Sequence, residues 1–289
     1  MPEGDTIWRT ARRLNEALAN EVIISADLRW PGLSTADLRG MRTLEVVSRG
    51  KNLLHRLDAG LTLHSHLRME GQWRVETTEG LANRVLANPQ LRALVSTARW
   101  TALGLRLGEL HLLSTRDEGR LVGHLGPDVL GTDWDAAEAA GRLAASMSTI
   151  GSALLDQRNL AGVGTLYASE ALFLERLSPW HPAASLASAQ VRQVVDRVHR
   201  LLNVNRHNVI QSTTGVQRHG MTTYVHGRSG RPCRRCGDAV RVSVLGVPPQ
   251  ERAFFYCPTC QGGLAAGDEG RPQGPLGSSA GSPGRRRLV

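Results

Sequence analysis

The chain has 289 residues, 41% of them hydrophobic, and a formal net charge of +9, which suits two ordinary domains or two with a small appendage. No run of about 18 apolar residues occurs, and the acidic MPEGD start lacks the order of a signal peptide, so we expect a cytoplasmic protein without a membrane partner. The basic excess favours a polyanionic partner, nucleic acid first, although an arginine-rich composition by itself is the alternative.

The first element that the sequence predicts is a helix starting near Asp5 and Thr6, whose side-chain oxygens are good N-caps. Apolar residues then follow at helical spacing, namely Ile7, Ala11, Leu14 and Leu18. Pro2 and Glu3 would therefore project just upstream of a rigid helix start. The alternative is that Met-Pro is a common beginning with no chemical role.

Residues 21 to about 120 form short β-rich segments separated by turn signals, which favours a sandwich or a barrel. This region contains Lys51, the only lysine among 35 basic residues, in a Gly-Lys hairpin turn. A lone lysine can be an accident of composition. It can also mark a site that needs a compact ammonium able to release a proton, which arginine cannot do.

The glycine- and proline-rich stretch GHLGPDVLG, residues 123–131, is the expected domain boundary, and a helical pattern follows from Trp134. One helix runs into Leu155 and another opens at Thr165, with Gly162 and Gly164 in the turn between them. Free backbone amides at the start of the second helix would offer a phosphate-binding site. A plain packing corner between two helices is an equally good interpretation.

All four cysteines lie in two C-x2-C pairs separated by 20 residues: Cys233, Cys236, Cys257 and Cys260. Four thiolates on two tight turns can converge on one structural zinc ion per chain, with a β-hairpin between the pairs. Two disulfides or a redox pair are the alternatives, and a cytoplasmic location disfavours both. From residue 262 onward the composition is rich in Gly, Ser, Pro and Arg, which predicts a disordered tail.

Five motifs occur in a characteristic order: MPEGDT, SRGKNLL at 48–54, HSHLRMEGQW at 64–73, LLDQRNLAGVG at 154–164 and the terminal CRRC…CPTCQ. Over about residues 1–261 the chain resembles the formamidopyrimidine-DNA glycosylase and endonuclease VIII family, and most of all the actinobacterial endonuclease VIII branch. The resemblance implies a multidomain α+β fold. Its expected parts are an N-terminal helix with a β-sandwich (1–122), a linker (123–133), a helical helix-two-turn-helix DNA-binding domain (134–222), a zinc-ribbon finger (223–261) and the tail (262–289).

The same resemblance implies a bifunctional DNA glycosylase and AP lyase of base excision repair, acting as a monomer on damaged DNA at the bacterial nucleoid. Oxidised pyrimidines are the favoured substrates. An 8-oxoguanine or formamidopyrimidine enzyme and a catalytically impaired DNA-binding paralogue stay open. A zinc-ribbon protein that binds RNA or ribosomes is disfavoured, because a binder has no need of Pro2, Glu3 and Lys51 together.

Four residues receive catalytic roles from the resemblance. Pro2, exposed when Met1 is removed, would be the nucleophile, since its secondary amine is less basic than a lysine side chain. Glu3 would be the general acid, although a carboxylate favoured by the helix dipole is the alternative. Lys51 would bind phosphate and assist elimination. Arg252 would bind phosphates and assist δ-elimination. The alternative interpretation is a solvent-exposed arginine without a role in catalysis.

Four further residues are expected to contact DNA. Met69, with Arg68 beside it, matches the loop that fills the gap left by a flipped base, although methionine is also a common core residue. Gly164 would let the DNA backbone approach closely. Thr165 stands where the family usually has asparagine and lacks the reach of the amide, so this departure concerns DNA affinity more than the fold.

Overall fold

The structure, a computed structural model, describes residues 2–246 and 251–274. It divides into two compact units. Unit 1 comprises Met1–Asp135, Gln157–Val163 and Leu202–His207, and unit 2 comprises Ala136–Asp156, Gly164–Leu201 and Asn208–Val289. The sequence analysis assigned 157–163 and 202–207 to the helical domain, whereas here these two short segments pack with the N-terminal part of the chain.

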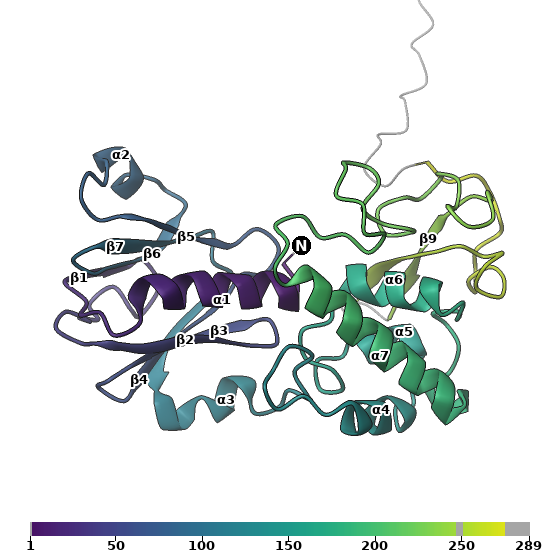
Figure 1. The fold of residues 1–289 in the computed structure, drawn as a ribbon, viewed down its shortest axis with the longest axis horizontal. Coiled ribbons are helices and arrows are strands. Elements are labelled where there is room, and N and C mark those ends of the chain that lie inside the picture. Colours follow the sequence, from purple (N-terminus) through teal and green to yellow (C-terminus); the bar gives the residue numbers. More distant parts are fainter. Residues whose placement is uncertain (1, 247–250, 275–289) are drawn as a thin grey trace, which may run out of the picture. The chain divides into compact units, whose positions relative to one another are not determined.

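Unit 1 begins with helix α1 (Gly4–Leu18), drawn in purple in Figure 1. The expected N-cap at Asp5 and Thr6 is wrong. Glu3 is the N-cap, with extended backbone at φ −117° and ψ −177°, and Asp5 is buried inside the first turn. The predicted apolar face is confirmed, because the buried residues repeat at helical spacing: Ile7, Ala11, Leu14 and Leu18.

The remainder of unit 1 is mainly a β-sandwich, as the sequence predicts. One antiparallel sheet has the order β1-β6-β7-β5, formed by Ser25–Leu28, Leu91–Ser96, Trp100–Leu105 and Gln72–Thr77. The other has the order β2-β3-β4-β8, formed by Thr43–Arg49, Asn52–Leu57, Leu61–His66 and Glu109–Ser114. Both sheets and α1 contribute to one hydrophobic core, which fixes the helix along strand β2.

Short helical turns complete unit 1: α2 (Asn83–Leu86), η1 (Thr115–Asp117) and α3 (Gly119–Val122). Unit 2 contains η2 (Ala183–Ser185) and the helices α4 (Ala136–Ala144), α5 (Ile150–Leu155), α6 (Thr165–Leu174) and α7 (Ser188–Asn205), the last of which ends in unit 1. No helix within the described part of the chain is long and apolar enough to cross a membrane.

The cysteine-bearing module of unit 2 is built on the hairpin of β9 (Arg241–Leu245) and β10 (Arg252–Tyr256). The pairing is antiparallel, with Arg252 opposite Leu245 at one end and Tyr256 opposite Arg241 at the other. Strand β10 packs against α6, and a small core of buried residues holds the two together: Phe173, Val225, Val240 and Phe255. The predicted hairpin between the cysteine pairs is therefore confirmed.

The first part of the expected tail, residues 262–274, packs back onto this hairpin. Asp268 accepts two hydrogen bonds from Arg241 and one from the Tyr256 hydroxyl, and it thereby joins both members of one cross-strand pair. These bonds, first of all those from Arg241, lower the pKa of Asp268 to about 2. Gln273 donates to and accepts from the backbone of Val242, which covers the free edge of β9. The expectation of disorder is thus wrong for residues 262–274, and residues 275–289 lie outside the described residues.

Candidate functional site

The N-terminal segment of unit 1 places a buried carboxyl group at the start of a helix. Glu3 is 0% exposed and Pro2 is half-buried. The Glu3 side chain makes no capping hydrogen bond, so capping does not explain why this residue is a glutamate.

Three glycines from distant parts of unit 1 meet next to this segment, and we call them the glycine junction: Gly4, Gly50 and Gly162. The Gly4 amide donates to the Gly162 carbonyl oxygen at 2.9 Å. A Cβ added to Gly4 would lie 3.1 Å from the Gly162 Cα atom, and one added to Gly50 would lie 3.0 Å from the Ala161 Cβ atom. A side chain at Gly4 or Gly50 would therefore require the neighbouring segment to move by a few tenths of an ångström, and Gly162 has a positive φ of 99° that disfavours other residues. The junction brings Glu3, which precedes Gly4, close to the turn that carries Lys51.

Lys51 lies in a two-residue turn that joins β2 to β3, since Arg49 pairs directly with Asn52. Gly50 supplies the positive φ of 58° that such a turn requires. Lys51 is half-buried. Its charge helps to lower the pKa of His66, after the larger effect of burial, so the two side chains share one electrostatic environment. The predicted Gly-Lys hairpin turn is confirmed.

Arg68 and Met69 lie in the loop between β4 and β5. Arg68 has a φ of 53° and forms an ion pair with Glu109. Met69 is 65% exposed, which excludes the alternative of a core side chain. An exposed, flexible methionine on a tight loop is available for an external partner.

In unit 2, helix α6 opens at Thr165 as predicted, with Gly164 as its N-cap in extended conformation. Thr165 is only 6% exposed, and Gly164 has no side chain with which to cap the helix. Both residues are buried, so the start of α6 exposes neither the Gly164 backbone nor the Thr165 side chain to any large extent.

The four cysteines converge in unit 2, with all Sγ atoms within 4.8 Å of one another. The Cys236 and Cys257 Sγ atoms are 3.5 Å apart and those of Cys233 and Cys260 are 3.9 Å apart. Both separations exceed the S–S bond of about 2.05 Å, and the cysteines are free thiols. Tetrahedral Zn–S bonds of about 2.3 Å would put the sulfurs about 3.8 Å apart, so the cluster has about the dimensions of a four-thiolate metal site.

Arg252 begins strand β10 and is exposed, and its guanidinium contacts the Glu251 backbone oxygen. This arginine, the cysteines and Gly164 belong to unit 2. Pro2, Glu3, Lys51 and the Met69 loop belong to unit 1.

Sequence reasoning missed Glu170, a fully buried carboxyl group on α6. It accepts hydrogen bonds of 2.8 Å from the amides of Tyr224, Val225 and His226, and another from the Thr213 hydroxyl. Burial raises the pKa of Glu170, and these hydrogen bonds oppose that shift. Glu170 thereby ties α6 to the segment that leads into the cysteine module. A lone carboxylate in the otherwise apolar helix TLYASEALFL was the signal available in the sequence.

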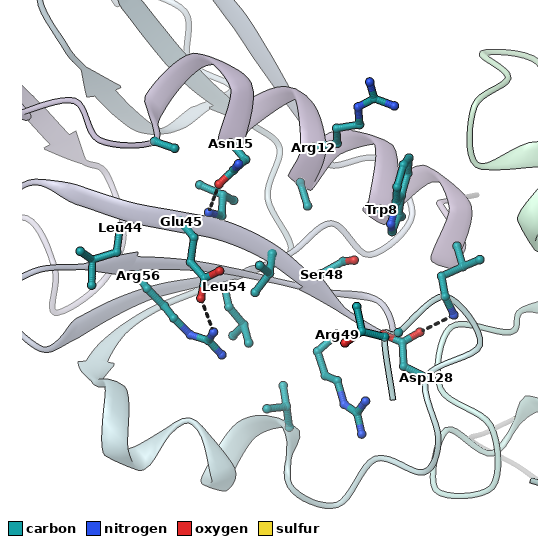
Figure 2. Close-up of a pocket in the computed structure, with 18 of the residues that line it drawn as sticks. Trp8, Arg12, Asn15, Leu44, Glu45, Ser48, Arg49, Leu54, Arg56 and Asp128 are labelled. Carbon is teal, nitrogen blue, oxygen red and sulfur yellow. Dashed lines mark hydrogen bonds and ion pairs between the residues drawn. The ribbon is translucent and has the colours of Figure 1, made fainter. Parts of the chain in front are cut away.

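A hollow of about 860 Å³ lies between α1, β2 and the 128–133 loop of unit 1, and Figure 2 shows it in close-up. Its lining includes neither Pro2, Glu3 nor Lys51. Its charged side chains are largely paired with one another: Arg56 with Glu45 and Glu118, and Arg49 with Asp133. The hollow is therefore not the reactive centre, although Asp128 at one end of it connects to the glycine junction.

Comparison with known proteins gives consistent matches over most of the chain. Residues 1–121 match the family described as formamidopyrimidine-DNA glycosylase N-terminal domain, and residues 125–216 match the formamidopyrimidine-DNA glycosylase H2TH domain. A probable endonuclease 8 2 of Streptomyces coelicolor is 46% identical over 94% of this chain and 98% of its own length. A DNA-(apurinic or apyrimidinic site) lyase of Mycolicibacterium smegmatis is 40% identical over 90% of this chain and 99% of its own length.

Solved structures agree in fold. A formamidopyrimidine-DNA glycosylase of Thermus thermophilus superimposes with a TM-score of 0.72 at 32% identity, covering 91% of this chain and all of that chain. The Lactococcus lactis enzyme, solved with DNA containing an abasic site, gives a TM-score of 0.74 at 24% identity. The match covers 90% of this chain and 99% of that chain. The described chain thus shares its architecture with proteins that handle damaged DNA.

Proposed function

Because the chain belongs to the formamidopyrimidine-DNA glycosylase and endonuclease VIII family, we propose that it excises oxidised bases from DNA through a Schiff base on Pro2 and then cleaves the strand by β,δ-elimination. Membership makes it a DNA glycosylase and AP lyase of base excision repair, whose partner is damaged DNA. The observation that carries the residue assignment is the glycine junction, which gathers the N-terminus and the Lys51 turn. We expect the protein to act as a monomer at the bacterial nucleoid.

The proposed chemistry starts at the Pro2 nitrogen, which becomes a free secondary amine when Met1 is removed. The unprotonated amine attacks C1′ of the damaged nucleoside and the N–C1′ bond to the base breaks. The sugar ring then opens at the C1′–O4′ bond, with a proton delivered to O4′, and an iminium remains on the enzyme. Glu3 is buried beside this amine and donates the proton that the sugar or the departing base requires. The iminium acidifies the neighbouring sugar carbon, so the two phosphates can leave in successive eliminations.

Lys51 and Arg252 supply positive charge where phosphates are held and released. A target base must leave the stack before attack, and we propose that the exposed Met69 fills the gap, with Arg68 beside it. Gly164 carries no side chain that would keep the DNA backbone away. The buried Thr165 provides less of a contact than the asparagine usual in the family, so we expect a weaker contribution to affinity at this position.

We propose the substrate class from the branch of the family that the chain resembles most. Relatives named endonuclease 8 are 39–46% identical to this chain, whereas those named formamidopyrimidine-DNA glycosylase are 30–32% identical. We therefore favour oxidised pyrimidines over oxidised purines. Borohydride trapping on a panel of duplexes tests this choice, with one lesion per duplex and an abasic duplex as reference. Preferential trapping on 8-oxoguanine would reverse it, and trapping on the abasic duplex alone would leave a lyase without glycosylase activity.

The metal of the cysteine cluster is proposed to be one structural zinc ion. Four thiolates leave no open coordination position, so the ion would shape the hairpin that carries Arg252 without entering the reaction.

We expect Cys257→Ser to lose the metal and to weaken DNA binding at least about tenfold, while the sandwich of unit 1 stays folded. Arg252→Ala is the matched control, since it should retain the metal but show a flatter dependence of binding on salt, by about one phosphate contact. Metal content, DNA affinity at several salt concentrations and circular dichroism check both. Full activity of a metal-free protein would contradict a structural role for zinc.

A further inference from the structure

Asp128 is a buried carboxylate that the catalytic scheme does not use. It is 2% exposed and lies at the end of the hollow in Figure 2. Its Oδ2 atom accepts the Gly50 amide at 2.8 Å, and its Oδ1 atom accepts the Leu130 amide at 3.0 Å. Burial raises the pKa of Asp128, and these two amides act in the opposite direction. Gly50 directly precedes Lys51, so one oxygen of Asp128 holds the turn from which Lys51 projects.

The loop around Asp128 is in turn fixed to residues 157–163. The Ala161 amide donates to the Pro127 oxygen at 3.0 Å, and the Val129 amide donates to the Ala161 oxygen at 3.2 Å. Within the turn, Gln157 accepts the Gly162 amide at 3.0 Å and donates to the Val163 oxygen at 2.8 Å. All of these groups belong to unit 1. Hydrogen bonds to residues 157–163 therefore hold the loop that carries Asp128 in place.

The glycine junction completes the connection to the N-terminus. The Gly162 carbonyl oxygen accepts a hydrogen bond from the Gly4 amide, and Gly50 packs against Ala161. One braced segment thus contacts the residue after Glu3 on one side and the residue before Lys51 on the other.

We infer that Asp128 is a positioning residue, which fixes the Gly50-Lys51 turn against residues 157–163 and so places the Lys51 ammonium relative to the Pro2 amine. This inference rests on the proposed function for its kinetic consequence. Asparagine cannot replace the carboxylate, because it offers one acceptor oxygen and turns an NH2 group toward the second backbone amide. The ladder between β2 and β3 remains in Asp128→Asn, so the strands stay paired while the turn loses its anchor.

The composition of the chain provides a direct readout of the surroundings of Lys51. Lys51 is the only lysine, so after removal of Met1 the protein has just two amines, the Lys51 Nζ atom and the Pro2 nitrogen. Reductive methylation with isotope-labelled formaldehyde would label both, and the dimethylated lysine differs from the monomethylated proline in its NMR signal. The pH titration of each signal reports the surroundings of one amine.

The experiment compares wild type, Asp128→Asn and Asp58→Asn. Asp58 is the matched control, since its exposed carboxylate also accepts a backbone amide, that of Arg42 at 3.0 Å, but at the opposite end of the β2–β3 hairpin from Lys51. In Asp128→Asn we expect the lysine signal to shift its titration by about 0.5 pH unit or more. We also expect single-turnover base excision by the unlabelled variant to fall roughly 10- to 100-fold, while KM changes less than about threefold. Asp58→Asn should match wild type in both measurements.

Two results would overturn the inference. One is an Asp128→Asn protein whose lysine signal and excision rate equal those of wild type. The other is a loss of excision that Asp58→Asn shares, or that accompanies unfolding of the sandwich in circular dichroism. A wild-type protein that excises no lesion and traps on no abasic site would instead refute the proposed function, and the lysine titration would still decide whether Asp128 holds the turn.

Discussion

A chain extended by one residue ahead of Pro2 should lose borohydride trapping on abasic DNA by about 1000-fold or more, equivalent to about 4 kcal/mol. The extension converts the Pro2 nitrogen into an amide, whose lone pair is delocalised into the carbonyl group and is no longer nucleophilic. The fold should be unaffected, because Pro2 precedes α1 and is only half-buried. Mass spectrometry of the wild-type crosslink should place the DNA on residue 2.

Pro2→Ala is the matched comparison for this experiment. It keeps an α-amine, now primary, at the same position, so some trapping should remain. A crosslink found on Lys51, or one undiminished in the extended chain, would refute the assignment of the nucleophile. Combining the extension with Lys51→Arg leaves the α-amine of the added residue as the remaining amine, so any residual crosslink should map to that added residue.

Lys51→Arg should separate binding from chemistry. We expect its affinity for lesion-containing duplex to stay within about tenfold of wild type, or 1.4 kcal/mol, because arginine binds phosphate at least as well as lysine. Single-turnover base excision should fall about 100-fold or more. The site is a half-buried two-residue turn beside His66, where a planar guanidinium is bulkier than an ammonium and cannot give up a proton. Cleavage at preformed abasic sites should suffer less, since the base has already gone.

Arg49→Lys provides the control for Lys51→Arg. Arg49 is the neighbouring cation on the same hairpin, and it pairs with Asp133 at 3.1 Å on the side of the hollow. Exchanging arginine for lysine there should leave excision within about threefold of wild type. Equal excision by Lys51→Arg and wild type would make Lys51 a surface cation, and its uniqueness in the chain would then be a coincidence.

Local sequence patterns were sufficient for several features. The two C-x2-C pairs predicted the sulfur cluster, because each tight turn fixes two thiolates and the hairpin between them brings the turns together. The spacing of Ile7, Ala11 and Leu14 predicted the buried face of α1, and the Gly-Lys pair predicted the turn at residues 50–51. In each case the signal lies within a few residues of the feature it specifies. The order of the motifs along the chain predicted the family in the same way.

Other features were decided only by the tertiary structure. Glycine carries no side chain and leaves no hydrophobic pattern, so the meeting of Gly4, Gly50 and Gly162 is visible only once the segments are packed. In the sequence, Asp128 lies in the glycine- and proline-rich stretch expected to be a domain boundary, yet its burial and its hydrogen bond from the Gly50 amide make it an anchor. Likewise, Asp268 lies in a stretch whose composition predicts disorder, but the buried Arg241 and Tyr256 hold it in place. The sequence by itself determined the local elements, the cysteine cluster and the residues suited to the chemistry. Contacts between residues far apart in the chain determined which backbone groups hold those residues in position, because such contacts form only when the whole chain folds.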